Sequence, residues 1–402
     1  MPRKPSSPSA ATIHISRRGA ERLRDGHVWV YRSDLISSDG ITPGALVHVS
    51  DERGKFLGTA LYSSASQIAI RLISRQEVAD FPALLRERIQ QAVAYRERLL
   101  SLGNAHQTDA YRVIFSEGDF LPGLIVDRYN DLLSLQILTQ AMDAEPVRQT
   151  VLSELTGRFH PAAIAERVDP KIRELEELPP RASGLLQGEK SATVFTMNDV
   201  KFHFDALEGQ KTGAFLDQRE NYAAAAEYAR GEALDVFCYQ GGFALHLAQK
   251  CSQVTGVDSS RPALEVAERN ATLNGGREIE WIEANAFDLL RDYSAAGRQY
   301  DTVVLDPPAF AKSKKTLDTA LRGYKELNLR ALKMLRPGGV LVTCSCSYHV
   351  SPACFLEVLT QAAQDVHRTI RVLENRGQAR DHPMLLTVPE TSYLKCCVLN
   401  VS

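Results

Sequence analysis

The sequence has no long hydrophobic run. None of its apolar segments approaches the roughly 18–20 residues that a membrane-spanning helix needs, so we expect no membrane partner. The first residues, MPRKPSSPSAA, are basic but lack the apolar stretch of a secretory signal. We therefore expect residues 1–11 to form a flexible tail and the protein to be cytoplasmic.

Cysteine is also scarce, with seven residues among 402 and no regular spacing. An odd number of cysteines in a large chain is typical of a reducing compartment. Cys344 and Cys346 lie close together in VTCSCSYHV, but the sequence holds no second Cys or His pair at zinc spacing, so we expect no metal. The pair could be two inert core residues, a redox couple, or one nucleophile with a buried neighbour.

Neither sign of charge dominates, since 47 Lys and Arg face 49 Asp and Glu. The distribution is uneven, however, because residues 1–76 hold eleven Lys and Arg against six Asp and Glu. A small basic region suits a polyanionic partner such as RNA. The alternative is a solvated basic face that binds nothing.

The spacing of apolar, Gly and Pro residues divides the first half of the chain into two parts. Residues 12–76 contain short β-rich runs broken by Gly and Pro, which predicts a small β-rich module or barrel. Residues 81–102 have a helical period and a charged outer face, which indicates a connecting helix. Strand-like and helical segments continue to Phe204, so residues 77–205 are expected to form this helix and a compact α+β domain.

Residues 206–402 have a different pattern, in which strand-like runs alternate with helical ones. This alternation predicts an α/β domain with a parallel sheet covered by helices on both faces. The last apolar run has no helix after it and is expected to add an antiparallel strand. Ligands of such sheets bind at the carboxyl ends of the strands. The five predicted parallel strands are ALDVFC, QVTGVD, IEWIEA, DTVVLD and GVLVTCSC.

The first strand ends in a loop that differs from a dinucleotide-binding loop. Gly241 and Gly242 open a helix, but Phe237 and Tyr239 occupy positions that such a loop gives to glycine. This disfavours a pyrophosphate cradle and hence a nicotinamide dehydrogenase. Asp258 ends the second strand, where an acid can bind both hydroxyls of a ribose. A nucleoside without phosphates, such as S-adenosylmethionine, would fit this loop.

Two further strand ends carry reactive groups. Asp306 is followed by Pro307 and Pro308, which cannot continue a strand and hold a carboxylate at the sheet rim. The next strand brings Cys346 to the same rim, where a thiol is placed for nucleophilic attack. Cys344 lies one pleat deeper, and the two Cα atoms would be roughly 6.5–7 Å apart, at the limit of disulfide reach. The nucleophile interpretation is therefore favoured.

Seven motifs spread along the chain form a recognisable set: GHVWVYRSDL, YRVIFSEGDFLPGLIVDRY, EGQKTGAFLDQREN, DVFCYQGGFALHLA, LDPPAF, CSCS and PETSYLK. With them the chain resembles the rRNA large-subunit methyltransferase I family, bacterial RNA 5-methylcytosine methyltransferases that use S-adenosylmethionine. The resemblance implies a class I (Rossmann-like) methyltransferase domain over residues 206–402, a PUA-like RNA-binding domain over 12–76 and a small central α+β domain over 77–205.

The resemblance also implies roles for single residues. Cys346 would be the nucleophile, Asp306 the acid that binds the target base, and Asp258 the acid that binds the ribose. Asn285 stands where family members commonly have an acid. The expected cofactor contacts are Phe215, Asp217, Gln218, Arg219, Asp235, Phe237, Tyr239, Gly241, Gly242, Asp258, Ser259, Asn285, Ala286 and Asp306.

The expected function is formation of 5-methylcytosine in 23S rRNA through a covalent bond between Cys346 and C6 of the base. One alternative is methylation of a guanine nitrogen, because a DPP-x-Phe turn also occurs in such enzymes, which need no cysteine. A second is a non-catalytic RNA-binding protein that retains the cofactor fold. The expected partners are RNA and, as one option for the assembly, a second copy of the chain.

Overall fold

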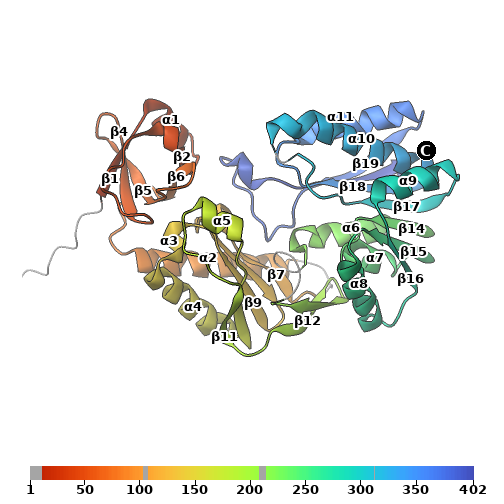
Figure 1. Cartoon of the computed structure of the whole chain (residues 1–402), viewed down its shortest axis with the longest axis horizontal. Coiled ribbons are helices and arrows are strands. Elements are labelled where there is room, and N and C mark those ends of the chain that lie inside the picture. The colour runs from red at the N-terminus through yellow and green to blue at the C-terminus, as the bar shows by residue number, and fades with distance from the viewer. Residues whose placement is uncertain (1–10, 103–106, 208–213, 312) are drawn as a thin grey trace, which may run out of the picture.

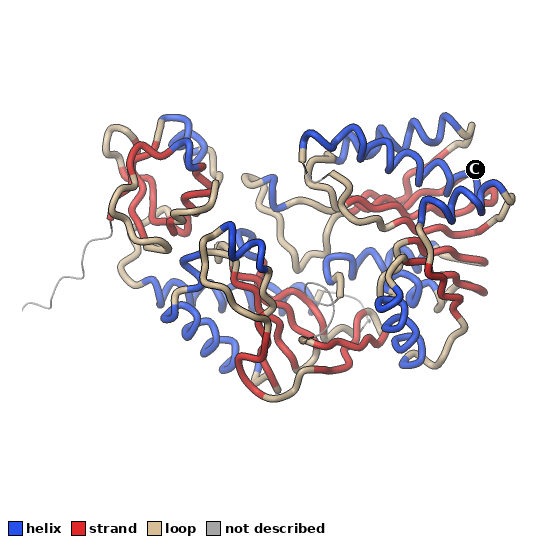
Figure 2. The backbone as a smooth tube through the Cα atoms, viewed as in Figure 1, coloured by secondary structure: helices blue, strands red, loops and turns tan. Residues whose placement is uncertain are grey.

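The computed structural model describes residues 11–102, 107–207, 214–311 and 313–402. The expected flexible tail lies outside the described residues, apart from Ala11, which begins the first strand. Figures 1 and 2 show a small β-rich module, a central part and a larger α/β part arranged along the chain. In the described part of the chain, no helix has both the length and the apolar character to span a bilayer.

The N-terminal module, residues 11–74, is a six-stranded sheet in the order β2-β6-β5-β4-β1-β3. Val47 and Val49 are buried at alternate positions, as expected for a strand with one face in a core. The short helix α1 was not predicted, because among its charged residues only Gly19, Ala20 and Leu23 are buried. The elements are β1 (Ala11–Ile15), α1 (Arg17–Arg24), β2 (Trp29–Tyr31), β3 (Leu35–Ser37), β4 (Leu46–Asp51), β5 (Phe56–Tyr62) and β6 (Ile68–Ser74).

The central unit, residues 81–188, begins with the expected connecting helix, which Asp80 caps through a bond from Ala83 N. Its five-stranded sheet has the order β11-β10-β9-β8-β7. The elements are α2 (Phe81–Ser101), β7 (Ala110–Phe115), β8 (Leu124–Tyr129), β9 (Leu132–Ile137), α3 (Gln140–Asp143), α4 (Glu145–Phe159), β10 (Ala163–Glu166), α5 (Pro170–Leu175) and β11 (Gly184–Gly188).

A two-stranded hairpin, β12 (Ala192–Met197) and β13 (Val200–Asp205), joins the central unit to the rest of the chain. Its aromatic side chains pack on both sides. The ring of Phe204 stacks on Tyr129 with centroids 3.9 Å apart, and Phe202 belongs to the same hydrophobic cluster as Tyr222. The domain boundary that we predicted between residues 205 and 206 therefore lies within a continuous core.

The C-terminal unit, residues 214–402, contains a seven-stranded sheet in the order β16-β15-β14-β17-β18-β20-β19. The five predicted strands are present and parallel, and the last strand pairs antiparallel with β18, as predicted. An additional edge strand, β19, was not predicted. The strands are β14 (Glu232–Val236), β15 (Gln253–Asp258), β16 (Ile279–Glu283), β17 (Tyr300–Leu305), β18 (Leu335–Ser345), β19 (Ile370–Arg376) and β20 (Lys395–Val401).

Helices cover both faces of this sheet (Figure 1). One hydrophobic cluster joins α6, α7 and α8 to one face, and a second joins α9, α10 and α11 to the other. Because β14 to β18 are parallel, their carboxyl ends all lie at the same edge of the sheet. The helices are α6 (Arg219–Tyr228), α7 (Gly242–Leu247), α8 (Arg261–Leu273), α9 (Ala286–Ala295), α10 (Leu317–Met334) and α11 (Pro352–Asp365).

A long connection between β19 and β20, residues 377–394, is called the crossing loop here because it contacts the other parts of the molecule. Val388 is fully buried within the hydrophobic cluster of the N-terminal module, and Glu390 lies 3.1 Å from His27 Nε2. The carbonyl of Asp381 accepts a 2.8 Å bond from the buried Arg96 of α2. The crossing loop thus ties the C-terminal unit to both preceding parts.

Candidate active site

Two neighbouring strands bring Asp306 and Cys346 together. Leu305, the last residue of β17, pairs with Thr343 of β18, so the residues after both strands lie at the same edge. The sulfur of Cys346 is 3.9 Å from the carbonyl oxygen of Pro307. The rigid turn after Asp306 and the thiol are therefore in contact, as the sequence predicts.

Asp306 is held by Gln218, whose Nε2 donates a 2.9 Å bond to Oδ1. Gln218 lies in a short 3-10 turn before α6 and is itself fixed by Asn221 Nδ2, which donates to its Oε1 at 2.7 Å. Burial, and then the nearby charge of Asp217, raise the pKa of Asp306 to about 7. Near neutral pH this carboxyl group can thus either donate or accept a proton.

The two cysteines have different environments. Cys344 is fully buried and lies opposite Cys396 in the sheet, where burial raises its pKa well above the ordinary value. Cys346 is only partly buried, and its pKa is raised to about 11 by burial and by the charges of Asp306 and Asp217. Cys346 is thus the accessible thiol, while Cys344 packs in the core beside it.

Lys395, the last residue of the PETSYLK motif, lies in the same site, although the sequence indicated no role for it. This side chain is 6% exposed, and its Nζ donates 2.7 Å bonds to the carbonyl oxygens of Ser347 and Tyr393. Burial lowers the pKa of Lys395 to about 8, while the charge of Cys346 acts in the opposite direction. Lysine is seldom buried, so its burial here indicates a special role. The sequence alone does not show this burial.

On the other side of the site, the loop after β14 is organised by Asp258. The Oδ2 atom of Asp258 accepts a 2.9 Å bond from Tyr239 N, and Oδ1 accepts one of the same length from Ser260 N. Phe237 and Tyr239 both have positive φ, at 68° and 49°. A carboxylate has about four acceptor sites, so Asp258 keeps capacity for two more donors.

Gly241 and Gly242 are required by packing inside the protein. A Cβ atom on Gly241 would come within 2.9 Å of the Trp281 ring, and one on Gly242 within 2.5 Å of the Tyr222 ring. Gly241 also has φ of +85°, which disfavours other residues. The glycines therefore let the loop pack closely against two aromatic rings.

Four other predicted residues lie on the same side. Asp235 is fully buried at the end of β14, where its Oδ2 accepts a 2.8 Å bond from Ala244 N, and burial raises its pKa well above the ordinary value. Asn285 caps α9 by accepting from Phe287 N at 2.9 Å, which uses its oxygen and leaves its nitrogen to donate. Ala286 and the exposed Ser259 begin the segments after β16 and β15.

The segment GAFLDQRE is only partly brought to the site, and its Gly213 lies outside the described residues. Phe215 is 47% exposed and meets the Tyr239 ring edge-on at 5.2 Å. Asp217 accepts a 2.7 Å bond from the Tyr393 hydroxyl. Arg219 lies apart from them, since its guanidinium is 3.3 Å from Asp381 of the crossing loop. This geometry favours a role for Arg219 in joining the units.

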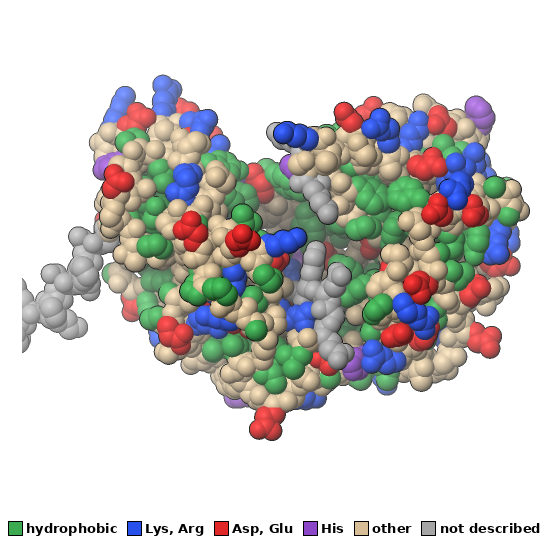
Figure 3. Space-filling view, in the orientation of Figure 1, with side chains coloured by type: hydrophobic (Ala, Val, Ile, Leu, Met, Phe, Trp, Pro, Cys, Tyr) green, Lys and Arg blue, Asp and Glu red, His purple; other side chains and the backbone are tan. Residues whose placement is uncertain are grey.

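The segment that follows Cys346 contains Tyr348, which is 52% exposed. The pKa of Tyr348 is raised by burial and then by the charge of Glu390 of the crossing loop, and Glu390 also lies 3.1 Å from His27 Nε2 of the N-terminal module. The surface is hollowed between the N-terminal module and the C-terminal unit (Figure 3). The crossing loop contacts the N-terminal module through Val388 and Glu390 and so links these two parts.

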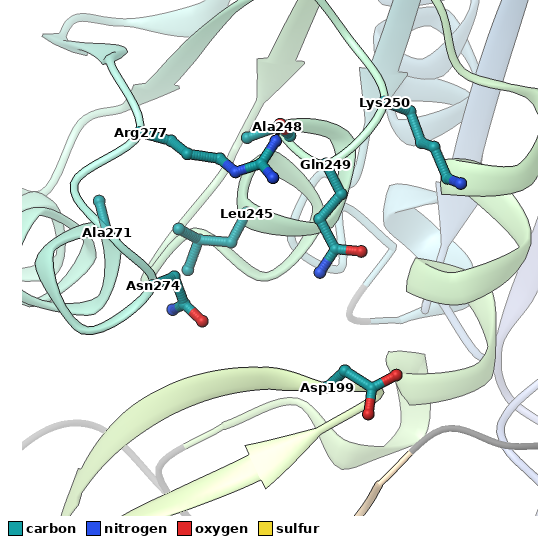
Figure 4. Close-up of a pocket in the computed structure, with 8 residues that line it drawn as sticks. All are labelled: Asp199, Leu245, Ala248, Gln249, Lys250, Ala271, Asn274 and Arg277. Atoms are coloured by element: carbon teal, nitrogen blue, oxygen red, sulfur yellow. Dashed lines mark hydrogen bonds between the residues drawn. The ribbon is translucent and has the colours of Figure 1, made fainter.

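A separate cavity of about 340 Å³ lies at the opposite edge of the sheet, where α7 and α8 lead into β15 and β16 (Figure 4). It is distant from the strand ends that carry Asp306 and Cys346. The residues around it are Asp199, Leu245, Ala248, Gln249, Lys250, Ala271, Asn274 and Arg277. Across the ranges that the structure describes, no three His, Cys, Asp or Glu side chains gather as metal ligands.

Comparison with known proteins identifies the family. Residues 13–75 match the family model of the PUA-like domain, and residues 127–385 match that of the S-adenosylmethionine-dependent methyltransferases. The chain is 37% identical to the ribosomal RNA large subunit methyltransferase I of Photobacterium profundum, over 96% of this chain and 98% of the relative. The protein of the same name from Tolumonas auensis is 38% identical over 97% and 99%. The chain belongs to the ribosomal RNA large subunit methyltransferase I family.

Solved structures agree on the fold of this large subunit methyltransferase I chain. An S-adenosylmethionine-dependent methyltransferase from Streptococcus mutans has a TM-score of 0.82 at 18% identity, covering 97% of this chain and 100% of the other. A methyltransferase solved with SAH has a TM-score of 0.83. The predicted Rossmann-like domain with an N-terminal PUA-like domain is confirmed, and S-adenosylmethionine is the cofactor.

The strand-end residues of this family member fit S-adenosylmethionine. Asp258 retains acceptor sites for a ribose diol, and the amide nitrogen of Asn285 can donate to an acceptor on an adenine edge. The loop after β14 presents the aromatic residues Phe237 and Tyr239 where a phosphate cradle would need glycine. A nucleoside without phosphates suits this set of groups better than a dinucleotide does.

Proposed function

We propose that this protein methylates C5 of a cytosine in 23S rRNA and that Cys346 forms a covalent bond with C6 of the base. Its relatives are named for the large subunit ribosomal RNA, which suggests the substrate. The observation that carries the chemistry is the contact between the Cys346 thiol and the turn after Asp306. Methylation of a guanine nitrogen would need no thiol at this position.

Cytosine C5 needs activation before it can accept a methyl group. Attack of the Cys346 thiolate on C6 breaks the C5–C6 double bond and makes C5 electron-rich, as in other covalent catalysis. Asp306, with its pKa raised to about 7, can give a proton to N3 as negative charge develops on the ring. The carboxyl group and the thiol would thus act on two positions of the same ring.

The rest of the reaction returns these residues to their first state. S-adenosylmethionine supplies the methyl group that C5 accepts. The C5 proton then leaves to a base, the C6–S bond breaks, and its electrons return to the Cys346 sulfur. Asp306 recovers its proton from N3. Phe215, Asp258 and Asn285 would hold the cofactor during these steps.

The target cytosine must be unstacked, because C6 is not accessible within a helix. The N-terminal module would hold the surrounding RNA mainly through phosphate contacts. The contact between His27 of the module and Glu390 of the crossing loop, which joins it to the C-terminal unit, supports this role. We place the reaction in the cytoplasm, where rRNA is made and assembled in bacteria. A homodimer stays a prediction, and the mechanism does not depend on it.

Covalent trapping tests this proposal. A 23S rRNA transcript that contains 5-fluorocytidine should form a stable adduct with the wild-type protein and S-adenosylmethionine, because fluorine cannot leave as a proton. The matched variants are Cys346→Ala, which should form no adduct, and Cys344→Ala, which should still form one. Both variants should bind S-adenosylmethionine, which calorimetry would check.

Other outcomes would change the assignment. An adduct that persists in Cys346→Ala but is lost in Cys344→Ala would make Cys344 the nucleophile. Methylation by the wild type without any adduct would favour the guanine reaction. Bisulfite mapping of 23S rRNA from a strain that lacks this protein should then show no missing 5-methylcytosine.

A further inference from the structure

Lys395 is attached to the backbone on both sides of Cys346. Strand pairing sets Lys395 of β20 opposite Ser345 of β18, the residue before the cysteine. The side chain then reaches past the cysteine, and Nζ donates to the carbonyl oxygen of Ser347 at 2.7 Å. A third attachment, also 2.7 Å long, runs from Nζ to the Tyr393 carbonyl. The position of Nζ relative to Cys346 is consequently set by the sheet.

The charges around the thiol act against its ionisation, with one exception. Asp306 and Asp217 both disfavour a negative charge on Cys346, while Lys395 favours it. Burial acts in the same direction as the carboxylates, and together they raise the pKa of Cys346 to about 11. Near neutral pH the thiol therefore needs a neighbouring base if it is to attack C6.

The Lys395 amine has the properties of such a base. Burial lowers its pKa to about 8, so a substantial fraction is neutral near physiological pH. A neutral amine has two N–H bonds and one lone pair. Both donors can remain on the Ser347 and Tyr393 carbonyls while the lone pair accepts a proton. Protonation then changes no hydrogen bond that holds the side chain in place.

We propose that Lys395 takes the proton of Cys346 when the cysteine attacks its target. The S–H bond breaks, its electron pair forms the C6–S bond, and the proton forms the third N–H bond of an ammonium group. The same proton returns to sulfur when the C6–S bond breaks, so no external reactant is needed. This inference rests on the proposed function of Cys346 and extends it to a second residue.

Other titratable groups face this pair from the surrounding elements. They are Asp306 after β17, Asp217 before α6, Cys344 of β18, Tyr324 of α10 and Tyr393 before β20. Burial raises the pKa of Cys344, Tyr324 and Tyr393, so these three groups keep their protons near neutral pH. Asp306, with a pKa of about 7, is the competing proton acceptor.

Alkylation of Cys346 in the RNA-free protein tests the inference without using methylation. Iodoacetamide labelling is followed from pH 6 to 10 by mass spectrometry of the peptide that contains Cys346. The wild type should show a midpoint near the Lys395 pKa of about 8. In Lys395→Met the midpoint should rise by at least one unit, which makes labelling at pH 8 about tenfold slower or more. Lys190→Met, which removes an exposed lysine of the central region, should behave as wild type.

Three results would overturn the inference. An unchanged midpoint in Lys395→Met would exclude Lys395, and a midpoint that moves only in Asp306→Asn would assign the proton to the carboxylate. Slower labelling at every pH with the midpoint in place would show a purely structural role. Lys395→Gln serves as a second variant if Lys395→Met loses S-adenosylmethionine binding, which calorimetry reports.

The same data separate this inference from the proposed function. Suppose that the midpoint rises in Lys395→Met and that the wild-type protein forms no adduct with 5-fluorocytidine RNA. This result would support the Lys395–Cys346 pair and reject the 5-methylcytosine reaction. An adduct that forms at the wild-type rate in Lys395→Met would reject Lys395 and keep the reaction.

Discussion

Replacement of Asp258 by alanine should weaken cofactor binding and loosen the loop after β14. The Asp258 carboxylate already accepts bonds from Tyr239 N and Ser260 N, and its remaining acceptor sites suit two ribose hydroxyls. A hydrogen bond to a charged group contributes about 1.5–3 kcal/mol, so losing one such bond lowers affinity about 10- to 150-fold. The variant should also unfold more easily, because two backbone N–H groups lose their partner.

Calorimetry with S-adenosylhomocysteine and its 2′-deoxy analogue separates the two effects. The wild type should prefer the ribose form, and Asp258→Ala should bind both forms with the same weak affinity. Glu265→Ala removes an exposed carboxylate of α8 and should change neither affinity. A variant that still prefers the ribose form, or that binds as tightly as wild type, would refute the assignment of Asp258 to the ribose.

Two further predictions concern the other units. Deletion of residues 1–76 should weaken RNA binding and reduce its dependence on salt concentration in anisotropy titrations. Leu385 and Val388 are changed to serine in this variant, because the deletion exposes these apolar residues of the crossing loop. If affinity falls with salt concentration as steeply as in the wild type, the module does not bind phosphates. Burial raises the pKa of Asp381, but Arg219 and the adjacent histidine lower it below the ordinary range. The ionised Asp381 therefore stabilises the fold above about pH 4, and this stabilisation is lost as the pH falls further. Asp381→Asn should lower the free energy of unfolding, measured with urea, by about 3 kcal/mol at pH 7 and by less at pH 3. An equal loss at both pH values would contradict this explanation.

Most of the strands that could be predicted from the sequence are those whose side chains are mostly buried. Four of the five parallel strands of the C-terminal sheet, β14, β15, β17 and β18, are mostly buried, so their apolar runs were visible in the sequence. The edge strand β19 has a short apolar stretch in which Val372 and Leu373 are exposed, and the charged residues Glu374 and Arg376 end it, so it does not resemble a buried strand. The helix α1 was missed for a similar reason, because its buried stripe is narrow and its other residues are charged.

The candidate site was predictable to the extent that its groups follow strands. Asp306 and Cys346 end neighbouring strands, and chain order alone placed them at one edge. The contacts of Lys395 depend on the register between β18 and β20, and the pairing of Arg219 depends on the path of the crossing loop. Both bring together residues far apart in the chain, which a local pattern does not report.

The crossing loop has a consequence for the order in which the protein can fold. Val388 belongs to the hydrophobic cluster of the N-terminal module, yet it is synthesised after both the central and most of the C-terminal unit. Until Val388 is synthesised, the hydrophobic cluster of the N-terminal module lacks one of its fully buried residues. We therefore expect the final packing of this module to follow the synthesis of the crossing loop.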